Sequence, residues 1–170
     1  MYKSKDDGTP DIFSELSPFG GRLNRQNRWL RLAELIPWHE VEERYRAHYS
    51  AVGRPAKDAR LVSGLLAVKF LEGYSYDRAV QEFFENPYIQ FFCGFDAFAT
   101  SPDLLAPGLL SRKRREMAET IFDKFEADLL NLLATNPTLR EHFKQAPRSL
   151  HPEQTFWEKT RLCLKKLLPF

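Results

Sequence analysis

Residues 53–95 read GRPAKDARLVSGLLAVKFLEGYSYDRAVQEFFENPYIQFFCGF. The strongly apolar segment 58–72 is followed by Gly73, a residue type that ends helices, and by Ser75, a residue type that caps them. Asn86-Pro87 then opens a third short helix. This stretch therefore predicts three helices joined by tight turns.

The first of these helices has an apolar surface too wide for a helix that faces solvent. Leu61, Leu65 and Val68 share one face, and Val62, Leu66 and Phe70 share a neighbouring one. Gly64 lowers helix propensity by up to ~1 kcal/mol relative to Ala, which indicates close approach of another helix. We expect a core helix, and hence an all-α fold, a compact multi-helix domain with a helix-turn-helix-like core.

The second of the three predicted helices is a poor candidate for reading DNA. Its outer positions in segment 76–84 mix acidic and basic residues. The segment after it, 87–95, is dense in aromatic residues, which could stack on bases, but no basic residue is interleaved with them. Core packing is the favoured interpretation, and the stretch 53–95 is interpreted as a scaffold.

Composition is that of a globular protein. The 170 residues are 43% hydrophobic and 28% charged, with a net charge of +2, so any basic surface must be local. The N-terminal MYKSKDDGTPD has no apolar signal core, and no apolar run approaches the length of a membrane span. These features predict a cytoplasmic protein without membrane contact.

Metal and disulfide signals are weak. Cys93 and Cys163 have no metal-type spacing, and two buried free thiols are favoured over a disulfide. His39-Glu40 resembles the start of a zinc signature H-E-x-x-H, but Glu43 stands where the second histidine would be. No metal site and no cofactor is expected in this chain.

The strongest charge feature is the run Arg112, Lys113, Arg114 and Arg115, directly after Ser111. If Ser111 caps a helix, these cations lie in its first turn, where they oppose the helix dipole and could seat phosphate. The alternative is a solvated face on which Arg112 pairs with Glu116, and Arg115 with Glu119. DNA contact is the favoured interpretation.

Two further basic features precede it. Arg22, Arg25, Arg28 and Arg31 recur every third residue, so a helix there would place them along one side, as a phosphate-contacting edge or as a solvated face. Arg54 and Lys57 lie at the entrance to the core helix. We expect both features to clamp the DNA backbone on either side of the 112–115 run.

The chain divides into three parts by composition. Residues 1–20 are expected to be a flexible N-terminal segment, 21–134 a helical DNA-binding domain that ends in one long helix over 111–134, and 135–170 a helical extension. The extension is basic and includes an amphipathic segment from about Pro152, with Phe156, Trp157, Leu164 and Leu167. It could pack on the core or pair with another protomer.

Four segments in order resemble the N-terminal, InsH-like domain of bacterial insertion-sequence transposases. They are MYKSKD with PFGGRLNRQNRWLRLAELIPWHEVEERY, the turn GRPAKDARL, the segment KFLEGYSYDRAVQEFFENPYIQFFCGF, and LLSRKRREM, and together they span roughly residues 1–120. The resemblance implies a helical domain that binds terminal inverted repeats. It also implies a separate RNase H-like domain with an Asp-Asp-Glu triad, which would hold Mg²⁺ and which the 170 residues lack.

The expected function is therefore sequence-specific binding of double-stranded DNA at the ends of an insertion sequence, in DNA transposition, without catalysis by this chain. The expected location is the bacterial cytoplasm, in association with the nucleoid. The alternative is a non-catalytic interaction module that forms a homodimer or a mixed assembly with a full-length transposase.

Overall fold

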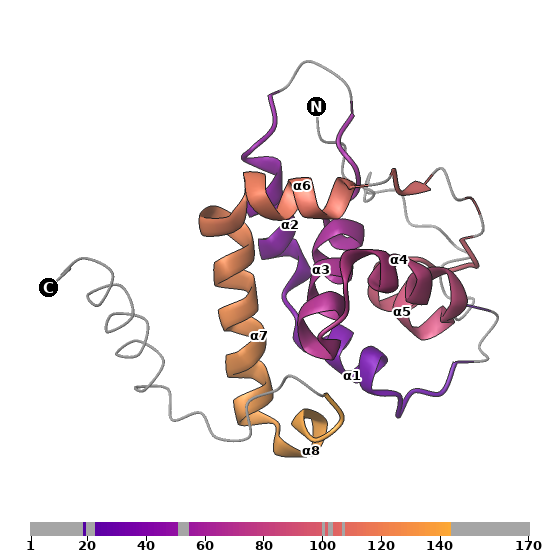
Figure 1. Ribbon diagram of the computed structural model, residues 1–170. Helices are drawn as coiled ribbons and strands as arrows, with labels where there is room; N and C mark the ends of the chain where they lie inside the picture. The colour runs from indigo at the N-terminus through magenta and orange to yellow at the C-terminus, as the bar shows by residue number, and fades with distance from the viewer. Residues whose placement is uncertain are drawn as a thin grey trace, which may run out of the picture.

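The structure is a computed structural model that describes residues 19, 23–50, 55–99, 101, 104–106 and 108–143. Every regular element in this part of the chain is helical, which confirms the all-α prediction (Figure 1). The helices are α1 (Arg28–Leu35), α2 (Trp38–Arg46), α3 (Ala59–Glu72), α4 (Tyr76–Glu85), α5 (Pro87–Phe92), α6 (Leu109–Glu116), α7 (Asp123–Thr135) and α8 (Pro137–Arg140), with the π-helical segment η3 (Ala118–Phe122) between α6 and α7.

Helix α3 lies at the centre of the fold. It packs against α2, α4, α6 and α7, and all but three of its residues are buried, so the prediction of a core helix is confirmed (Figure 1). Asp58 caps its start by accepting a hydrogen bond from the Leu61 amide at 2.9 Å. Gly73 ends it in the left-handed region, with φ of 68°.

Helices α4 and α5 begin where the sequence predicts. The Ser75 hydroxyl accepts a hydrogen bond from the Arg78 amide, and the Asn86 side chain accepts one from the Tyr88 amide, ahead of Pro87 at the first helical position. Ile89 and Phe92 of α5 are buried in the core. The aromatic segment is therefore core material, as predicted.

Cys93, the C-cap residue of α5, packs closely on α3 at Gly64. A β-carbon added to Gly64 would lie 2.9 Å from Cys93 Sγ and 3.2 Å from Cys93 Cα. Arg60, one turn earlier on α3, donates hydrogen bonds to the carbonyls of Phe92 (3.0 Å) and Phe91 (3.2 Å), and its guanidinium lies over the Trp38 ring at 4.7 Å. The expected close approach at Gly64 is confirmed.

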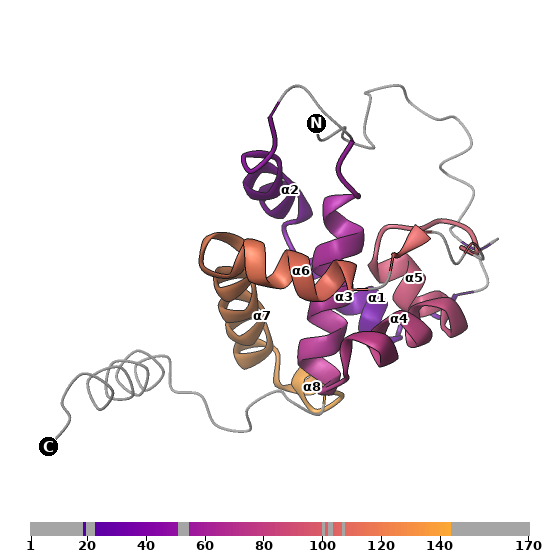
Figure 2. The same cartoon turned by 45° about the horizontal axis from the view of Figure 1, so that its top comes forward.

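The expected long helix over 111–134 is wrong, because the chain bends sharply at Met117. The Met117 carbonyl accepts hydrogen bonds from both Ile121 (3.1 Å) and Phe122 (3.2 Å), so one turn is widened into η3. Helix α6 lies across the end of the bundle and α7 descends from it along the side (Figures 1 and 2). The bend lets both helices bury apolar side chains, Leu110 of α6 and Leu129 of α7 among them, in one core.

The packed core continues past residue 134. Leu139 of α8 and Phe143 after it are 1% and 5% exposed, and the Phe143 ring lies 5.1 Å from that of Trp29 in α1. Helix α8 thus closes the end of the bundle opposite α6 (Figure 1). None of the helices that the structure describes is long and apolar enough to cross a membrane.

Candidate nucleic-acid interface

Helix α6 begins earlier than the sequence predicts, and this changes the position of the basic run. Its N-cap is Gly108, in the left-handed region with φ of 69°, and Ser111 lies inside the helix, where its hydroxyl donates to the Gly108 carbonyl at 3.0 Å. The prediction that Ser111 caps this helix is therefore wrong. The sequence contains no polar capping side chain at residue 108, which is why the local pattern favours Ser111 as the start.

The basic residues Lys113, Arg114 and Arg115 consequently occupy the last turn of α6. Cations at the C-terminal end of a helix are favoured by the helix dipole, so the expectation that they oppose it is also wrong. The charge run is compatible with helix stability, and its placement alone does not point to phosphate. The directions in which its side chains point decide what it can bind.

Lys113 points into the protein. Its ammonium donates to Glu116 at 2.8 Å and lies 5.2 Å from the centre of the Tyr49 ring, and 16% of its side chain is exposed. Burial by itself would lower the pKa of Lys113, but the contacts with Glu116 and Tyr49 outweigh it and raise that pKa. Lys113 thus joins α6 to the chain just after α2.

Arg114 also has protein partners. Its guanidinium pairs with Asp123 at 2.7 Å and with Glu126 at 3.2 Å, and 23% of its side chain is exposed. Burial would lower the pKa of Arg114, but the two carboxylates outweigh it and raise that pKa. Both partners lie on α7, nine and twelve residues along the chain, so only the bend at η3 brings them within reach.

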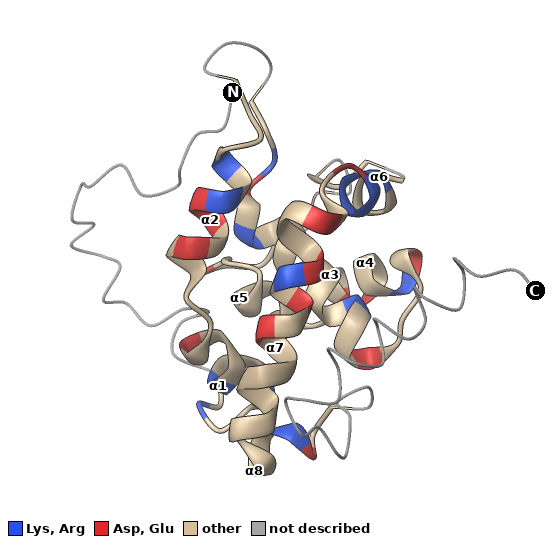
Figure 3. Ribbon diagram, turned by 90° about the vertical axis from the view of Figure 1, so that its left-hand side faces the viewer, with Lys and Arg blue, Asp and Glu red and all other residues tan. Residues whose placement is uncertain are grey.

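The two other arginines of the run face solvent. Arg112 has 57% of its side chain exposed and lies 3.8 Å from Glu116, a pair that the sequence predicts. Arg115 is exposed and forms no ion pair with a described residue, so the expected pair with Glu119 is absent. Being three residues apart, Arg112 and Arg115 lie on one side of α6. Basic residues mark most of the visible turn of α6, whereas α2 and α7 mix both signs (Figure 3).

The N-terminal arginines do not form the expected row. Helix α1 begins at Arg28, capped by Asn27, so Arg25 lies in the turn before it. Of the described arginines in this row, Arg28 and Arg31 are helical. Arg22 lies outside the described residues. The row fails because the Asn27 side chain accepts a hydrogen bond from the Trp29 amide and starts the helix there.

Arg28 is held by the protein. It pairs with Glu72 at 2.8 Å, donates to the His142 carbonyl, and lies 5.2 and 5.1 Å from the centres of the Trp29 and Phe143 rings. The carboxyl side chain of Glu72 is only 2% exposed. Arg28 is a structural residue that joins α1 to α3 and to the chain after α8.

Among the described residues, the structure does not bring Arg28 and the basic run of α6 into one surface. Arg28 lies beside α8, whereas α6 lies at the other end of α7, a helix ~20 Å long. Lys57 is half-buried and lies in the segment just before α3. Helix α6 contacts α3. Arg54 lies outside the described residues. Of the sequence-predicted residues in the described ranges, Arg112 and Arg115 are the exposed pair on one helical face.

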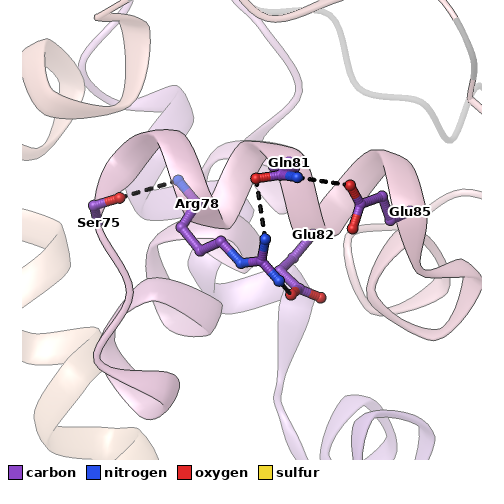
Figure 4. A network of polar contacts seen from close by, with 5 residues as sticks. All are labelled: Ser75, Arg78, Gln81, Glu82 and Glu85. Atoms are coloured by element: carbon purple, nitrogen blue, oxygen red, sulfur yellow. Dashed lines mark hydrogen bonds and ion pairs between the residues drawn. The ribbon is translucent and has the colours of Figure 1, made fainter.

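The polar side chains on the outer face of α4 bond to one another, as Figure 4 shows. Arg78 donates to Gln81 at 3.0 Å and pairs with Glu82, and Gln81 donates to Glu85 at 2.8 Å. These contacts within one helix neutralise Arg78. They support the interpretation of α4 as scaffold, because the helix presents no free cation that the structure describes.

No group of His, Cys, Asp and Glu side chains within the described ranges could hold a metal ion. His39 lies 3.7 Å from Glu43, both on the exposed side of α2. Cys93 is a buried free thiol, as predicted, and burial raises its pKa well above the ordinary range. Cys163 lies outside the described residues.

The roles of two structural arginines are not evident from the sequence. For Arg60, the only signal is a basic residue in the first turn of an otherwise apolar helix. For Arg114, the sequence gives no signal, because a run of four basic residues does not indicate which side chains face inward.

Comparison with known proteins places the chain in a family. The transposase domain family DUF772 matches residues 18–116, more than half of the chain, and the match ends at the last residue of α6. The chain is also 31% identical over 153 residues to the "Uncharacterized protein ORF8 in nfe locus" of Rhizobium meliloti, an alignment that covers 85% of this chain and 72% of that protein. No solved structure matches. The chain is a member of the DUF772 transposase domain family.

Proposed function

We propose that this chain binds double-stranded DNA in transposition, with the terminal inverted repeats of an insertion sequence as its target. Membership of a transposase domain family supports the process. The observation that carries the DNA-binding part is the exposed pair Arg112 and Arg115, which share one side of α6 inside the matched region. This is the role expected of an N-terminal, InsH-like transposase domain.

The dimensions and chemistry of α6 suit a DNA groove. An α-helix such as α6 is ~10–12 Å across with its side chains, which the ~12 Å wide major groove admits. Guanidinium groups pair with phosphates and make bidentate contacts with guanine edges. We assign Arg112 and Arg115 to these contacts and Lys57 to a flanking phosphate. Arg25, which lies in the turn before α1, is not assigned to a contact.

The test is duplex binding by the double variant Arg112→Ala/Arg115→Ala. The duplex carries the end of the insertion sequence that encodes the chain, and a scrambled duplex of equal length measures specificity. We expect roughly ten- to hundredfold weaker binding, and a salt slope, log K against log salt, that falls by about 0.9 for each phosphate that the variant no longer neutralises. The matched control is Arg46→Ala/Lys124→Ala, which removes two charges from α2 and α7. Equal affinity of the two double variants at several salt concentrations contradicts the proposal.

Binding of this kind requires no metal ion, since contacts to phosphates and base edges come from side chains. We therefore expect affinity for the duplex to be the same in EDTA and in Mg²⁺ at matched ionic strength. Cleavage and joining are assigned to a separate catalytic domain. Metal-dependent cleavage of the duplex by this chain alone would contradict that assignment.

A second candidate, a protein-interaction module, has one specific observation in its favour. An apolar groove of ≈ 380 Å³ lies between α2 and α7, and Ile36, Val41, Leu129 and Leu132 are among the residues that line it. Such a groove could seat another protomer or a full-length transposase. Sedimentation with and without duplex DNA separates the candidates, because assembly without DNA binding favours this one.

A further inference from the structure

We infer that Arg114 is a positioning residue, which holds the proposed DNA-contacting turn of α6 at a fixed angle to α7 and does not itself contact DNA. The inference rests on the proposed function of α6. It assigns opposite roles to neighbouring arginines that are indistinguishable in the sequence SRKRRE.

The geometry is that of a clamp across the bend. The Arg114 Nε and one terminal nitrogen each donate to a different Glu126 oxygen at 3.2 Å, and the same terminal nitrogen donates to Asp123 at 2.7 Å. A planar guanidinium that reaches two carboxylates is fixed in orientation, because each bond constrains the same rigid fork. Asp123 is the first residue of α7, so the clamp closes immediately beyond η3.

The bend needs such a clamp because its backbone bonding is irregular. The Met117 carbonyl accepts hydrogen bonds from two amides of η3. The regular α-helical pattern of backbone hydrogen bonds is therefore interrupted between α6 and α7. The apolar anchors of α6 lie at its ends, namely Leu109 and Leu110 at the start and Met117 just after it. The basic turn between them is therefore held by the polar contacts of Lys113 and Arg114.

The charges around Arg114 argue against a direct role with phosphate. One guanidinium faces two carboxylates, so the group carries a net charge of −1. A phosphate that approached Arg114 would be repelled by Asp123 and Glu126. Among the described residues, Arg112 forms an ion pair with Glu116, which Lys113 also binds, and Arg115 forms none. The clamp thus holds the α6 backbone while the exposed arginines stay free to bind.

The experiment measures duplex affinity over a range of salt for Arg114→Gln and for Asp123→Asn/Glu126→Gln. We expect both variants to bind about 3–30-fold more weakly with an unchanged salt slope. The second variant is the sharper one, because it binds more weakly even though two negative charges have been removed. If Arg114 contacts phosphate instead, Arg114→Gln lowers the slope by about 0.9, and freeing Arg114 from its acids raises affinity.

A charge exchange separates positioning from simple loss of stability. In an Asp123→Asn background, Arg114→Glu alone is expected to weaken binding, and Arg114→Glu/Glu126→Arg is expected to restore it by reversing the ion pair. If Arg114 binds DNA directly, the exchanged variant will not recover affinity, and that result overturns the inference. Thermal unfolding of each variant identifies the temperature at which all are folded. Should Arg114→Gln not fold, the Asp123→Asn/Glu126→Gln variant and the exchanged pair still decide the question.

The inference and the proposed function fail in different ways. Duplex binding by Arg112→Ala/Arg115→Ala with unchanged affinity would contradict the proposed function. Weak binding by that variant, together with normal binding by both clamp variants, removes only the inference.

Discussion

Gly64 of α3 and Cys93, which follows α5, are in such close contact that no side chain fits between them. A β-carbon at residue 64 would lie 2.9 Å from Cys93 Sγ and 3.2 Å from Cys93 Cα, both closer than ordinary van der Waals contact. The glycine therefore lets the C-cap of α5 approach α3 this closely. Its effect on helix propensity is secondary to this packing role.

The contact predicts that Gly64→Ala destabilises the protein. The substitution gains up to ~1 kcal/mol of helix propensity, but overpacking of a close contact costs about 1–3 kcal/mol. We expect a net loss of up to about 2 kcal/mol in the free energy of unfolding, measured by urea denaturation.

A double-mutant cycle with Cys93→Ala tests the cause. Removal of the sulfur relieves the shorter of the two contacts and leaves the contact with Cα. Gly64→Ala should therefore destabilise less in the Cys93→Ala background than in the natural chain. Equal effects in both backgrounds would show that sulfur crowding is not the reason.

Arg60 is predicted to hold the C-terminal end of α5. It donates to the Phe91 and Phe92 carbonyls, and hydrogen bonds to charged groups contribute about 1.5–3 kcal/mol each. Burial lowers the pKa of Arg60, yet an arginine stays protonated at neutral pH. Because the two bonds share one guanidinium, their contributions do not simply add, and we expect Arg60→Met to lower the free energy of unfolding by about 2–3 kcal/mol. Arg60→Lys should recover part of this loss, since an ammonium has no fork to reach both carbonyls, and full recovery would disprove the bidentate role.

Arg28 is predicted to matter for stability and not for DNA binding. It pairs at 2.8 Å with Glu72, whose side chain is 2% exposed, and removal of Arg28 leaves a buried carboxylate without this partner. Because 31% of the Arg28 side chain is exposed, we expect Arg28→Met to cost about 2–3 kcal/mol, less than a fully buried pair would.

Arg28→Met/Glu72→Gln supplies the control, since neutralising the acid should return part of the stability. Duplex affinity measured below the unfolding temperature should be normal in both variants. A reduced salt slope for Arg28→Met would instead place Arg28 at the DNA.

The Cys93 thiol predicts a loss of stability in alkali. Burial raises its pKa in the folded state, whereas an unfolded cysteine has a pKa near ~8.5. The contribution of the neutral thiol to the free energy of unfolding is therefore complete below about pH 8. It declines as pH rises above the pKa of the unfolded cysteine, because ionisation favours the unfolded chain. In a Cys163→Ser background, we expect unfolding free energy to fall between about pH 8 and 10, and to fall less in Cys93→Ala. Rapid labelling of Cys93 by a thiol reagent in the folded protein would contradict its burial.

Local sequence signals account for most of the fold. Asp58, Gly73, Ser75 and Asn86 set helix boundaries through hydrogen bonds within a few residues, and such contacts are visible in the sequence. The bend at Met117 was not predictable in this way. Segment 111–134 reads as one amphipathic helix, and the bend depends on packing of α6 across α3, which the local pattern does not encode.

The candidate site was predictable only as a charge run. Four consecutive cations identify a basic turn, but which of them face solvent depends on Tyr49, Asp123 and Glu126, which are distant in sequence or across the bend. The row of N-terminal arginines fails for a local reason, since Asn27 starts α1 later than the spacing implies. A spacing of three describes a helical face only where a helix exists.

The hydrogen bond from Arg28 to the His142 carbonyl joins residues that are 114 positions apart in the sequence. Helix α1 and the chain after α8 therefore stabilise each other, and we expect them to open together. Loss of Phe143 would uncover Trp29 and loosen α1, so the first and last helices should exchange amide hydrogens together, as one cooperative unit.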